Sequence, residues 1–193
     1  MKGTFSVSDD LDSYLDRVLI GGRERRDIVI EGYNPDWPKR FERERDRIAG
    51  ALGPRCGRID HVGSTAVPGL AAKPIIDIQL VVSDVDDEDS YLPALVAAGY
   101  VLRVRDLGHR MFRTPDFGVH VHLWKSEADV HRRILFRDWL RRSDEDRQRY
   151  ENLKRQLAER QWEDMNYYAQ AKGELIAKIM ERAEAWARDE RCG

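Results

Sequence analysis

The chain has little cysteine, no long apolar run and almost no net charge. Its two cysteines, Cys56 and Cys192, lie far apart, and no Cys/His spacing typical of a zinc site accompanies them. No apolar stretch approaches the roughly 20 residues that a transmembrane helix needs. The first ten residues, MKGTFSVSDD, lack the apolar region of a signal peptide. We therefore expect a cytoplasmic protein without a disulfide framework and without a membrane partner.

The balance of charges argues against several classes of partner. With 33 basic and 35 acidic residues, the net charge is −2 over 193 residues. The chain as a whole therefore carries no strong signal for nucleic acid or an anionic membrane. Its length is ample for a hydrophobic core and suits one domain with an appendage. No internal repeat, low-complexity tract or flexible linker interrupts it.

The N-terminal 22 residues are expected to form an appendage. Apolar residues recur at helical spacing from Leu11 to Ile20, and Gly21-Gly22 then ends the pattern. The segment 1–22 is predicted to be an extension helix, and 23–193 a single domain. Terminal helices of this kind offer a surface through which two copies could form a homodimer.

The main part changes character near residue 125. Up to that point, short apolar runs alternate with turns and helical patterns, whereas 126–193 is helical, so the predicted fold class is α+β. We expect strands over 27–31, 56–62, 74–82, 100–105, 109–113 and 118–124, and helices over 37–52, from the acidic segment 83–89 to 98, and over 127–141, 144–162 and 165–187.

Two pairs of polar residues lie inside predicted strands. Asp77 and Gln79 are two residues apart in an otherwise apolar run, and His120 and His122 are spaced in the same way. Residues two apart in a strand share one face, so each pair shares a face. A buried carboxylate is usually hydrogen-bonded, paired or bound to a metal. If the two strands are neighbours, the four side chains converge, and Asp77, His120 and His122 are candidate metal ligands and catalytic residues.

A turn before the Asp77 strand adds a candidate phosphate site. Gly63, Ser64 and Thr65 could supply backbone N–H groups and hydroxyls, and Lys73 could add a cation. Arg137, on a C-terminal helix, could reach a phosphate or could form a structural ion pair with its neighbour Asp138.

Two further lysines, Lys154 and Lys172, each follow a tyrosine by four residues. Each pair therefore shares a helix face. Such a lysine could line the cleft, but an exposed lysine that covers the tyrosine ring is the simpler interpretation.

The ordered motifs resemble the GrpB family (UPF0157), a group of predicted nucleotidyltransferases, some of which are fused to dephospho-CoA kinase. The resemblance covers about residues 27–175 and leaves the N-terminal helix outside. Its marks are YNPDWP at 33–38, DHVGSTAVPGL at 60–70, AKPIIDI at 72–78, HVHL at 120–123, LFRDWL at 135–140, Tyr150 through Lys154 and Tyr168 through Lys172.

The resemblance implies a fold and a reaction. The fold would be nucleotidyltransferase-like, of the polymerase-β type, with a mixed sheet, flanking helices and a C-terminal helical half. The reaction would transfer a nucleotidyl group from a nucleoside triphosphate to a small acceptor, with a divalent metal such as Mg, Mn or Zn.

This chain departs from the nucleotidyltransferase superfamily pattern. The superfamily has a second acid where this chain has Gln79, and His120 and His122 stand where a third acid is expected. An amide is a poor Mg²⁺ ligand, and histidine suits transition metals better. The alternatives are a non-catalytic nucleotide- or coenzyme-binding module and a His/Asp metal-binding protein.

Overall fold

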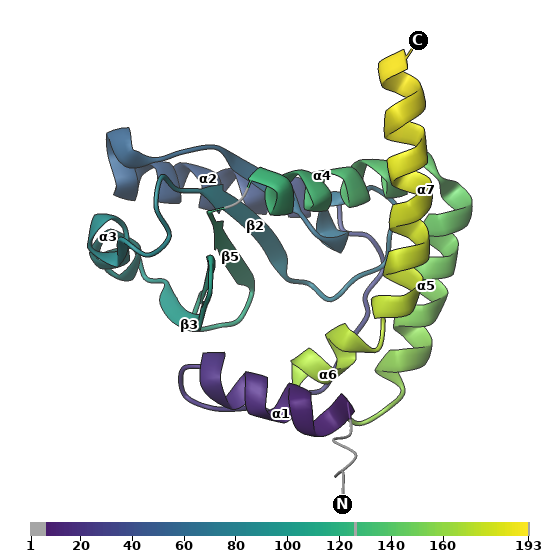
Figure 1. Ribbon diagram of the computed structural model, residues 1–193, viewed down its shortest axis with the longest axis horizontal. Helices are drawn as coiled ribbons and strands as arrows, with labels where there is room; N and C mark the ends of the chain where they lie inside the picture. Colours follow the sequence, from purple (N-terminus) through teal and green to yellow (C-terminus); the bar gives the residue numbers. More distant parts are fainter. Residues whose placement is uncertain (1–6, 126, 193) are drawn as a thin grey trace, which may run out of the picture.

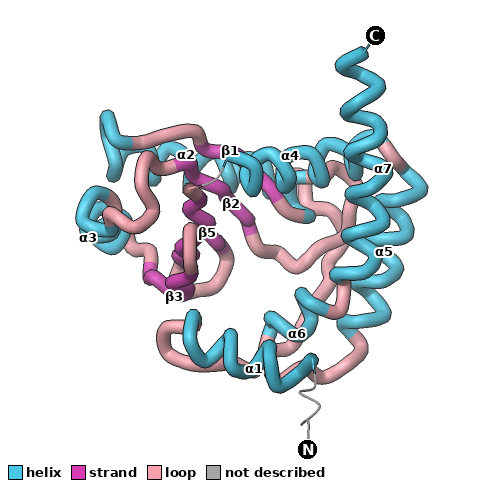
Figure 2. The backbone as a smooth tube through the Cα atoms, viewed as in Figure 1, coloured by secondary structure: helices cyan, strands magenta, loops and turns pink. Residues whose placement is uncertain are grey.

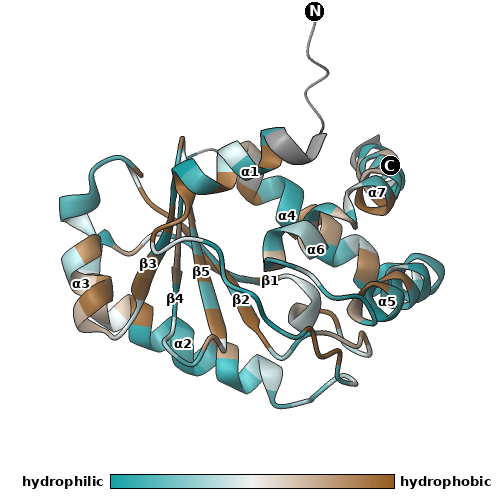
Figure 3. Cartoon of the chain, turned by 90° about the horizontal axis from the view of Figure 1, so that it is seen from below, coloured by the Kyte–Doolittle hydropathy of each residue, from teal (hydrophilic) through white to brown (hydrophobic). Residues whose placement is uncertain are grey.

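A five-stranded mixed sheet organises the protein, whose structure is a computed structural model that describes residues 7–125 and 127–192. The strands follow the order β1-β2-β5-β4-β3; Figure 1 labels β2, β5 and β3, and Figure 3 labels all five strands. β2 and β5 run parallel, and the other neighbouring pairs run antiparallel. The strands are β1 (Ile59–Val62), β2 (Ile76–Val81), β3 (Val101–Asp106), β4 (His109–Arg113) and β5 (Val119–Trp124).

The two faces of the sheet differ because side chains alternate along each strand. On one face, the apolar residues of β2 and β5 pack against α2 and α3 in the main core. In Figure 3, α2 and α3 lie on this side of the sheet, and α1 and α4 lie on the other. The helices are α1 (Val7–Val18), α2 (Trp37–Leu52), α3 (Leu92–Ala97) and α4 (Glu127–Arg142). The polar side chains of β2 and β5 therefore face α1 and α4.

The C-terminal helices stand beside one end of the sheet (Figure 2). They are α5 (Asp144–Ala158), α6 (Met165–Gln170) and α7 (Gly173–Cys192). Ser143 caps α5 and Asp164 caps α6, each by accepting a hydrogen bond from a backbone N–H of the first turn. Val67 and Leu70 form a second core with Leu140, Tyr150 and Ile179, so the helical half packs directly on the turn that follows β1.

The structure confirms the predicted mixture of sheet and helices and corrects three elements. The helix expected from the acidic segment 83–89 to 98 is shorter, because α3 begins at Leu92, after a single 3-10 turn at Glu88–Ser90. Residues 27–31 do not form a strand; Glu31 makes only an isolated bridge with Ala72. Ile28 is buried among residues of α5 and α6, so the apolar side chains here serve a helix contact and not a sheet. The predicted helix 165–187 is two helices, α6 and α7, separated by a turn before Gly173, a residue of low helix propensity.

The N-terminal helix packs on the sheet edge. Leu15 and Val18 are buried, Leu19 forms an isolated bridge with Val104 of β3, and the N–H of Ile20 donates to the Arg103 carbonyl. No helix in the described part of the chain is both long enough and apolar enough to cross a membrane.

Candidate active site

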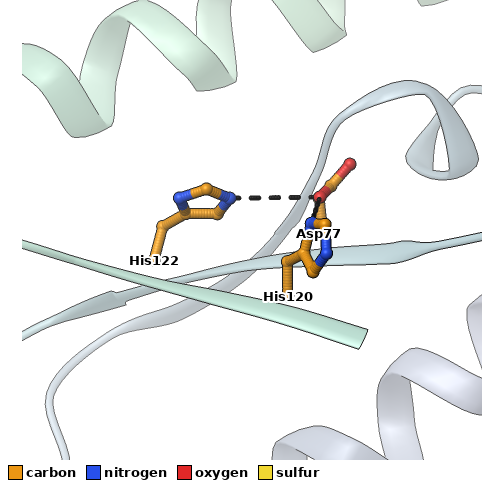
Figure 4. A group of neighbouring side chains, drawn as sticks. All are labelled: Asp77, His120 and His122. Carbon is orange, nitrogen blue, oxygen red and sulfur yellow. Dashed lines mark ion pairs between the residues drawn. The ribbon is translucent and has the colours of Figure 1, made fainter. Parts of the chain in front are cut away.

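Asp77, His120 and His122, here called the Asp–His triad, meet on the polar face of the sheet. Parallel pairing of β2 with β5 sets Asp77 opposite His120 and Gln79 opposite His122. The Asp77 carboxylate lies 3.4 Å from Nδ1 of His120 and 4.0 Å from Nε2 of His122 (Figure 4). The three ligand atoms lie within 4.8 Å of one another. Ligands of one metal ion, at about 2.1 Å each, can be up to about 4.2 Å apart, so the triad needs little movement to bind one.

The protonation states also suit a metal. Burial alone would raise the pKa of Asp77, but His120, His122 and Lys73 hold it at about 2. Burial lowers the pKa of His122 well below its ordinary value. At neutral pH the carboxylate is therefore ionised and the His122 imidazole is neutral, which are the forms that bind metals.

His109 on β4 fixes the orientation of the His122 ring. Its Nε2 lies 3.0 Å from Nδ1 of His122, on the side of that ring away from the atom that faces Asp77. The His109 ring stacks on Trp124, with ring centroids 4.0 Å apart. Such a hydrogen bond on the other ring nitrogen fixes the orientation and tautomer of a histidine ligand.

Gly63 brings the turn after β1 against Asp77. It has φ of 70°, in the left-handed region. A Cβ at this position would collide with the Asp77 carboxylate and lie 2.9 Å from its Cβ. Both the conformation and the close approach therefore require glycine.

Three lysines surround a cavity of about 140 Å³ beside the triad. Lys73, Lys154 and Lys172 line this lysine cavity together with Gly63, Ser64 and Thr65. Asp77 is the one carboxylate among the described lining residues. Lys154 is 2% exposed and donates a hydrogen bond to the Ala71 carbonyl.

Burying three lysine side chains around one cavity costs electrostatic free energy. Burial is the main cause that lowers the pKa of Lys154 to about 7 and the pKa values of Lys73 and Lys172 to about 8. Lys172 lowers the pKa of the other two lysines further, since like charges repel. A negatively charged group in the cavity would offset this repulsion.

The residues that the sequence predicted to bind phosphate fall into two groups in the structure. The structure brings Gly63, Ser64, Thr65 and Lys73 together at the lysine cavity, although the Thr65 hydroxyl already donates to the Ile75 carbonyl. Arg137 is not among the residues that line this cavity.

Arg137 instead joins α4 to β1. Its guanidinium makes a two-bond pair with Asp138, at 2.8 and 3.1 Å, and donates to the His61 carbonyl at 2.9 Å. These contacts match the structural alternative raised by the sequence.

Gln79 is fully buried below α4. Its amide nitrogen lies 3.3 Å from the Val130 carbonyl and 3.4 Å from Asp60, and its amide oxygen has no partner among the described residues. It supplies no second carboxylate next to Asp77.

Sequence reasoning missed the role of His109 and ranked a cleft-lining position second for Lys154 and Lys172, although both line the lysine cavity. The two lysines were expected to be exposed, and that expectation is wrong for the buried Lys154. The signal was the repeated Tyr-x-x-x-Lys spacing: the Lys172 ammonium lies 4.4 Å from the Tyr168 ring centre, and the Lys154 ammonium 4.9 Å from that of Tyr150. His109 carried no comparable signal.

The structure is that of an α+β protein in which a carboxylate–histidine cluster on a mixed sheet lies beside a lysine-lined cavity. The chain belongs to the GrpB family, since the family model described as "GrpB protein" matches residues 27–182. It is 50% identical over 168 residues to a UPF0157 protein of Streptomyces coelicolor, with 86% of this chain and 90% of the relative covered.

Two other relatives extend the comparison. A UPF0157 protein of Halalkalibacterium halodurans is 42% identical over 191 residues, which covers 96% of this chain and 98% of the relative. The crystal structure of conserved protein GrpB from Enterococcus faecalis matches with a TM-score of 0.72 and 30% identity, over 82% of this chain and 99% of that one.

Proposed function

We propose that the protein is a metal-dependent nucleotidyltransferase with a nucleotidyltransferase-like fold. The observation that carries the proposal is the convergence of Lys73, Lys154 and Lys172 on a cavity that adjoins the Asp–His triad. Three clustered ammonium groups against one carboxylate match a triphosphate, whose charge they would offset.

The triad would hold one divalent ion. Its donor set of one carboxylate and two imidazoles favours a transition metal such as Mn or Zn over Mg, which prefers oxygen ligands. A bound ion would supply positive charge to the reacting phosphate. His109 and Gly63 keep the triad in place, the first through His122 and the second by close contact with Asp77.

The proposed step is an in-line displacement at the α-phosphorus. A hydroxyl oxygen of the acceptor forms a new bond to that phosphorus, and the bond from phosphorus to the bridging oxygen of the β-phosphate breaks. Pyrophosphate leaves with the electron pair, and the lysines offset its charge. The hydroxyl proton passes to solvent water, because the lone pair of the His120 imidazole is used to bind the ion.

Calorimetry and a pyrophosphate-release assay test the proposal. Nucleoside triphosphates are titrated into the protein with Mn²⁺, Zn²⁺ or Mg²⁺, and pyrophosphate is then measured with a panel of small alcohols and amines. We expect metal-dependent binding that Asp77→Asn reduces more than tenfold, because the mutation removes the charged ligand of the ion. Asp60→Asn, on β1 and paired with Arg58, is the matched control. No triphosphate binding with any of the metals would refute the proposal.

A non-catalytic nucleotide-binding module is the second candidate. The buried Gln79 favours it, because this amide stands where the nucleotidyltransferase superfamily pattern has a second metal-binding acid. Metal-dependent triphosphate binding without pyrophosphate release from any acceptor would support the module and argue against the transferase.

A further inference from the structure

A second cavity, of about 230 Å³, adjoins the lysine cavity. We call it the N-terminal cavity, because Leu19, Glu24 and Arg26 form one of its walls. Lys73, Ile75 and His120 line both cavities, so His120 lies at their junction. The N-terminal wall lies outside residues 27–182, the range that the GrpB family model matches.

The N-terminal cavity combines an apolar lining with an excess of positive charge. Leu19, Val104, Met111, Met165 and Ala169 supply apolar surface. Four cations, Lys73, Arg26, Arg103 and Arg113, line it, against two carboxylates, Glu24 and Asp164.

The existing pairs leave this positive charge only partly offset. Glu24 forms a two-bond pair with Arg113, at 2.7 and 2.8 Å, and lies 3.6 Å from Arg26. Arg103 donates to the carbonyls of Ile20 and Gly22, which are neutral acceptors. One carboxylate therefore serves more than one guanidinium. Burial lowers the pKa of Arg26, as do the charges of Arg113 and Arg103, and Glu24 opposes them.

Phe117, a residue with a strained backbone, packs against two of these arginines. Phe117, between β4 and β5, has φ of 62°, a conformation that residues other than glycine rarely adopt. Its ring lies against the guanidinium of Arg26 and 4.3 Å from that of Arg113, measured to the ring centre. Backbone strain of this kind tends to occur at functional sites.

From these observations we propose that the N-terminal cavity is the acceptor subsite, and that the acceptor is a small organic anion, a carboxylate or phosphate monoester with an apolar body. This inference rests on the proposed nucleotidyl transfer. The anionic group would lie near Arg26, the apolar body against the methionines, and the nucleophile beside His120, facing the lysine cavity. The N-terminal segment would then help to select the acceptor.

Two probes separate the two cavities in calorimetric titrations of the full chain in the presence of saturating Mn²⁺. Phenyl phosphate carries an apolar ring and an anionic group, and inorganic tripolyphosphate mimics the nucleotide phosphates. We expect phenyl phosphate to bind in the presence of saturating tripolyphosphate and to bind at least tenfold more tightly than neutral benzyl alcohol. Benzoate distinguishes a carboxylate preference from a phosphate preference.

Neighbouring arginines provide a matched pair of variants. Arg26→Ala should weaken phenyl phosphate binding about tenfold, which corresponds to about 1.4 kcal/mol, and leave tripolyphosphate binding unchanged, because it removes one charged contact to the anionic group. Arg25→Ala should change neither, since Arg25 is exposed and bonds to Gln161. Val104→Trp fills the cavity and should abolish phenyl phosphate binding, while retained tripolyphosphate binding shows that the variant is folded.

The outcomes distinguish the two proposals. Displacement of phenyl phosphate by tripolyphosphate, an equal effect of Arg25→Ala and Arg26→Ala, or no phenyl phosphate binding would overturn the acceptor subsite and leave the nucleotide proposal standing. Binding of phenyl phosphate without any binding of tripolyphosphate would overturn the nucleotide proposal and the acceptor role with it.

Discussion

Replacing Lys172 with methionine should stabilise the ligand-free protein and weaken its binding of polyphosphate. The pKa of Lys172 falls from 10.5 to about 8, chiefly through burial, so its charge opposes folding at neutral pH. A difference of that size corresponds to about 3 kcal/mol at most, and to about 1–3 kcal/mol once residual solvent screening is allowed for. Methionine keeps most of the side-chain volume without the charge, so the free energy of unfolding should rise by that amount.

The sign of the pH dependence gives an independent check. Because the folded pKa lies below the unfolded value, the unfolded state binds more protons between pH 8 and pH 10.5. Stability of the natural protein therefore rises across that window as the penalty disappears. The advantage of Lys172→Met should be full below pH 8 and should vanish near pH 10.5.

Urea unfolding followed by tryptophan fluorescence measures both effects. Tripolyphosphate at 100 times its Kd should stabilise the natural protein by about 2.7 kcal/mol, and the same concentration should stabilise Lys172→Met clearly less. Lys178→Met is the control: Lys178 lies on α7, is 58% exposed and pairs with Glu174. Its substitution should stay within about 0.5 kcal/mol. Destabilisation by Lys172→Met, or equal stabilisation of both proteins by tripolyphosphate, would refute the reasoning.

Other substitutions test the surroundings of the triad. Gly63→Ala should cost about 1–3 kcal/mol and weaken Mn²⁺ binding, because its Cβ collides with the triad carboxylate. Gly69→Ala, at a similar positive φ in open space, should cost stability but keep Mn²⁺ affinity, as denaturation and titration would show. His109→Phe retains the ring but loses the hydrogen bond to the triad, so Zn²⁺ affinity should fall about 10- to 100-fold in a competition titration; unchanged affinity would contradict the orienting role. His61 is 8% exposed, and burial lowers its pKa from 6.5 to about 4. The unfolded state therefore binds more protons in that window, so stability should fall by about 2 kcal/mol from pH 7 to pH 5 through this group. His61→Gln should show a shallower loss of stability on acidification, and an unchanged slope would count against it.

Periodicity predicted the elements that are stabilised by their own amphipathic pattern. The helix 37–52 and the strand 109–113 have the predicted bounds, and the alternation of β5 places its histidines and valines on opposite faces. The segment 27–31 has a similar apolar content but no strand partner, and Ile28 packs against the helical half. The hydrophobic pattern indicates that a side chain is buried, but it does not indicate which element the side chain packs against.

The candidate site was likewise predicted in part from the sequence and decided in part by the tertiary structure. Strand alternation predicted that His120 and His122 share one face of their strand and that Asp77 shares a face with Gln79. Only the parallel pairing of β2 with β5 brings Asp77 and the two histidines onto the same face of the sheet, where they form one cluster. The use of Arg137 within an ion pair, and not at the cavity, depends on where α4 lies against β1.

By itself, the sequence determined the family, the α+β class and the carboxylate and imidazole groups that a metal site needs. These follow from local patterns and ordered motifs, which do not depend on distant contacts. Only the tertiary structure decided that Lys154 and Lys172 turn inward beside Lys73, and that the N-terminal segment forms the wall of a second cavity. The reason is that burial of a charge depends on the elements packed around it, and those elements are far apart in the chain.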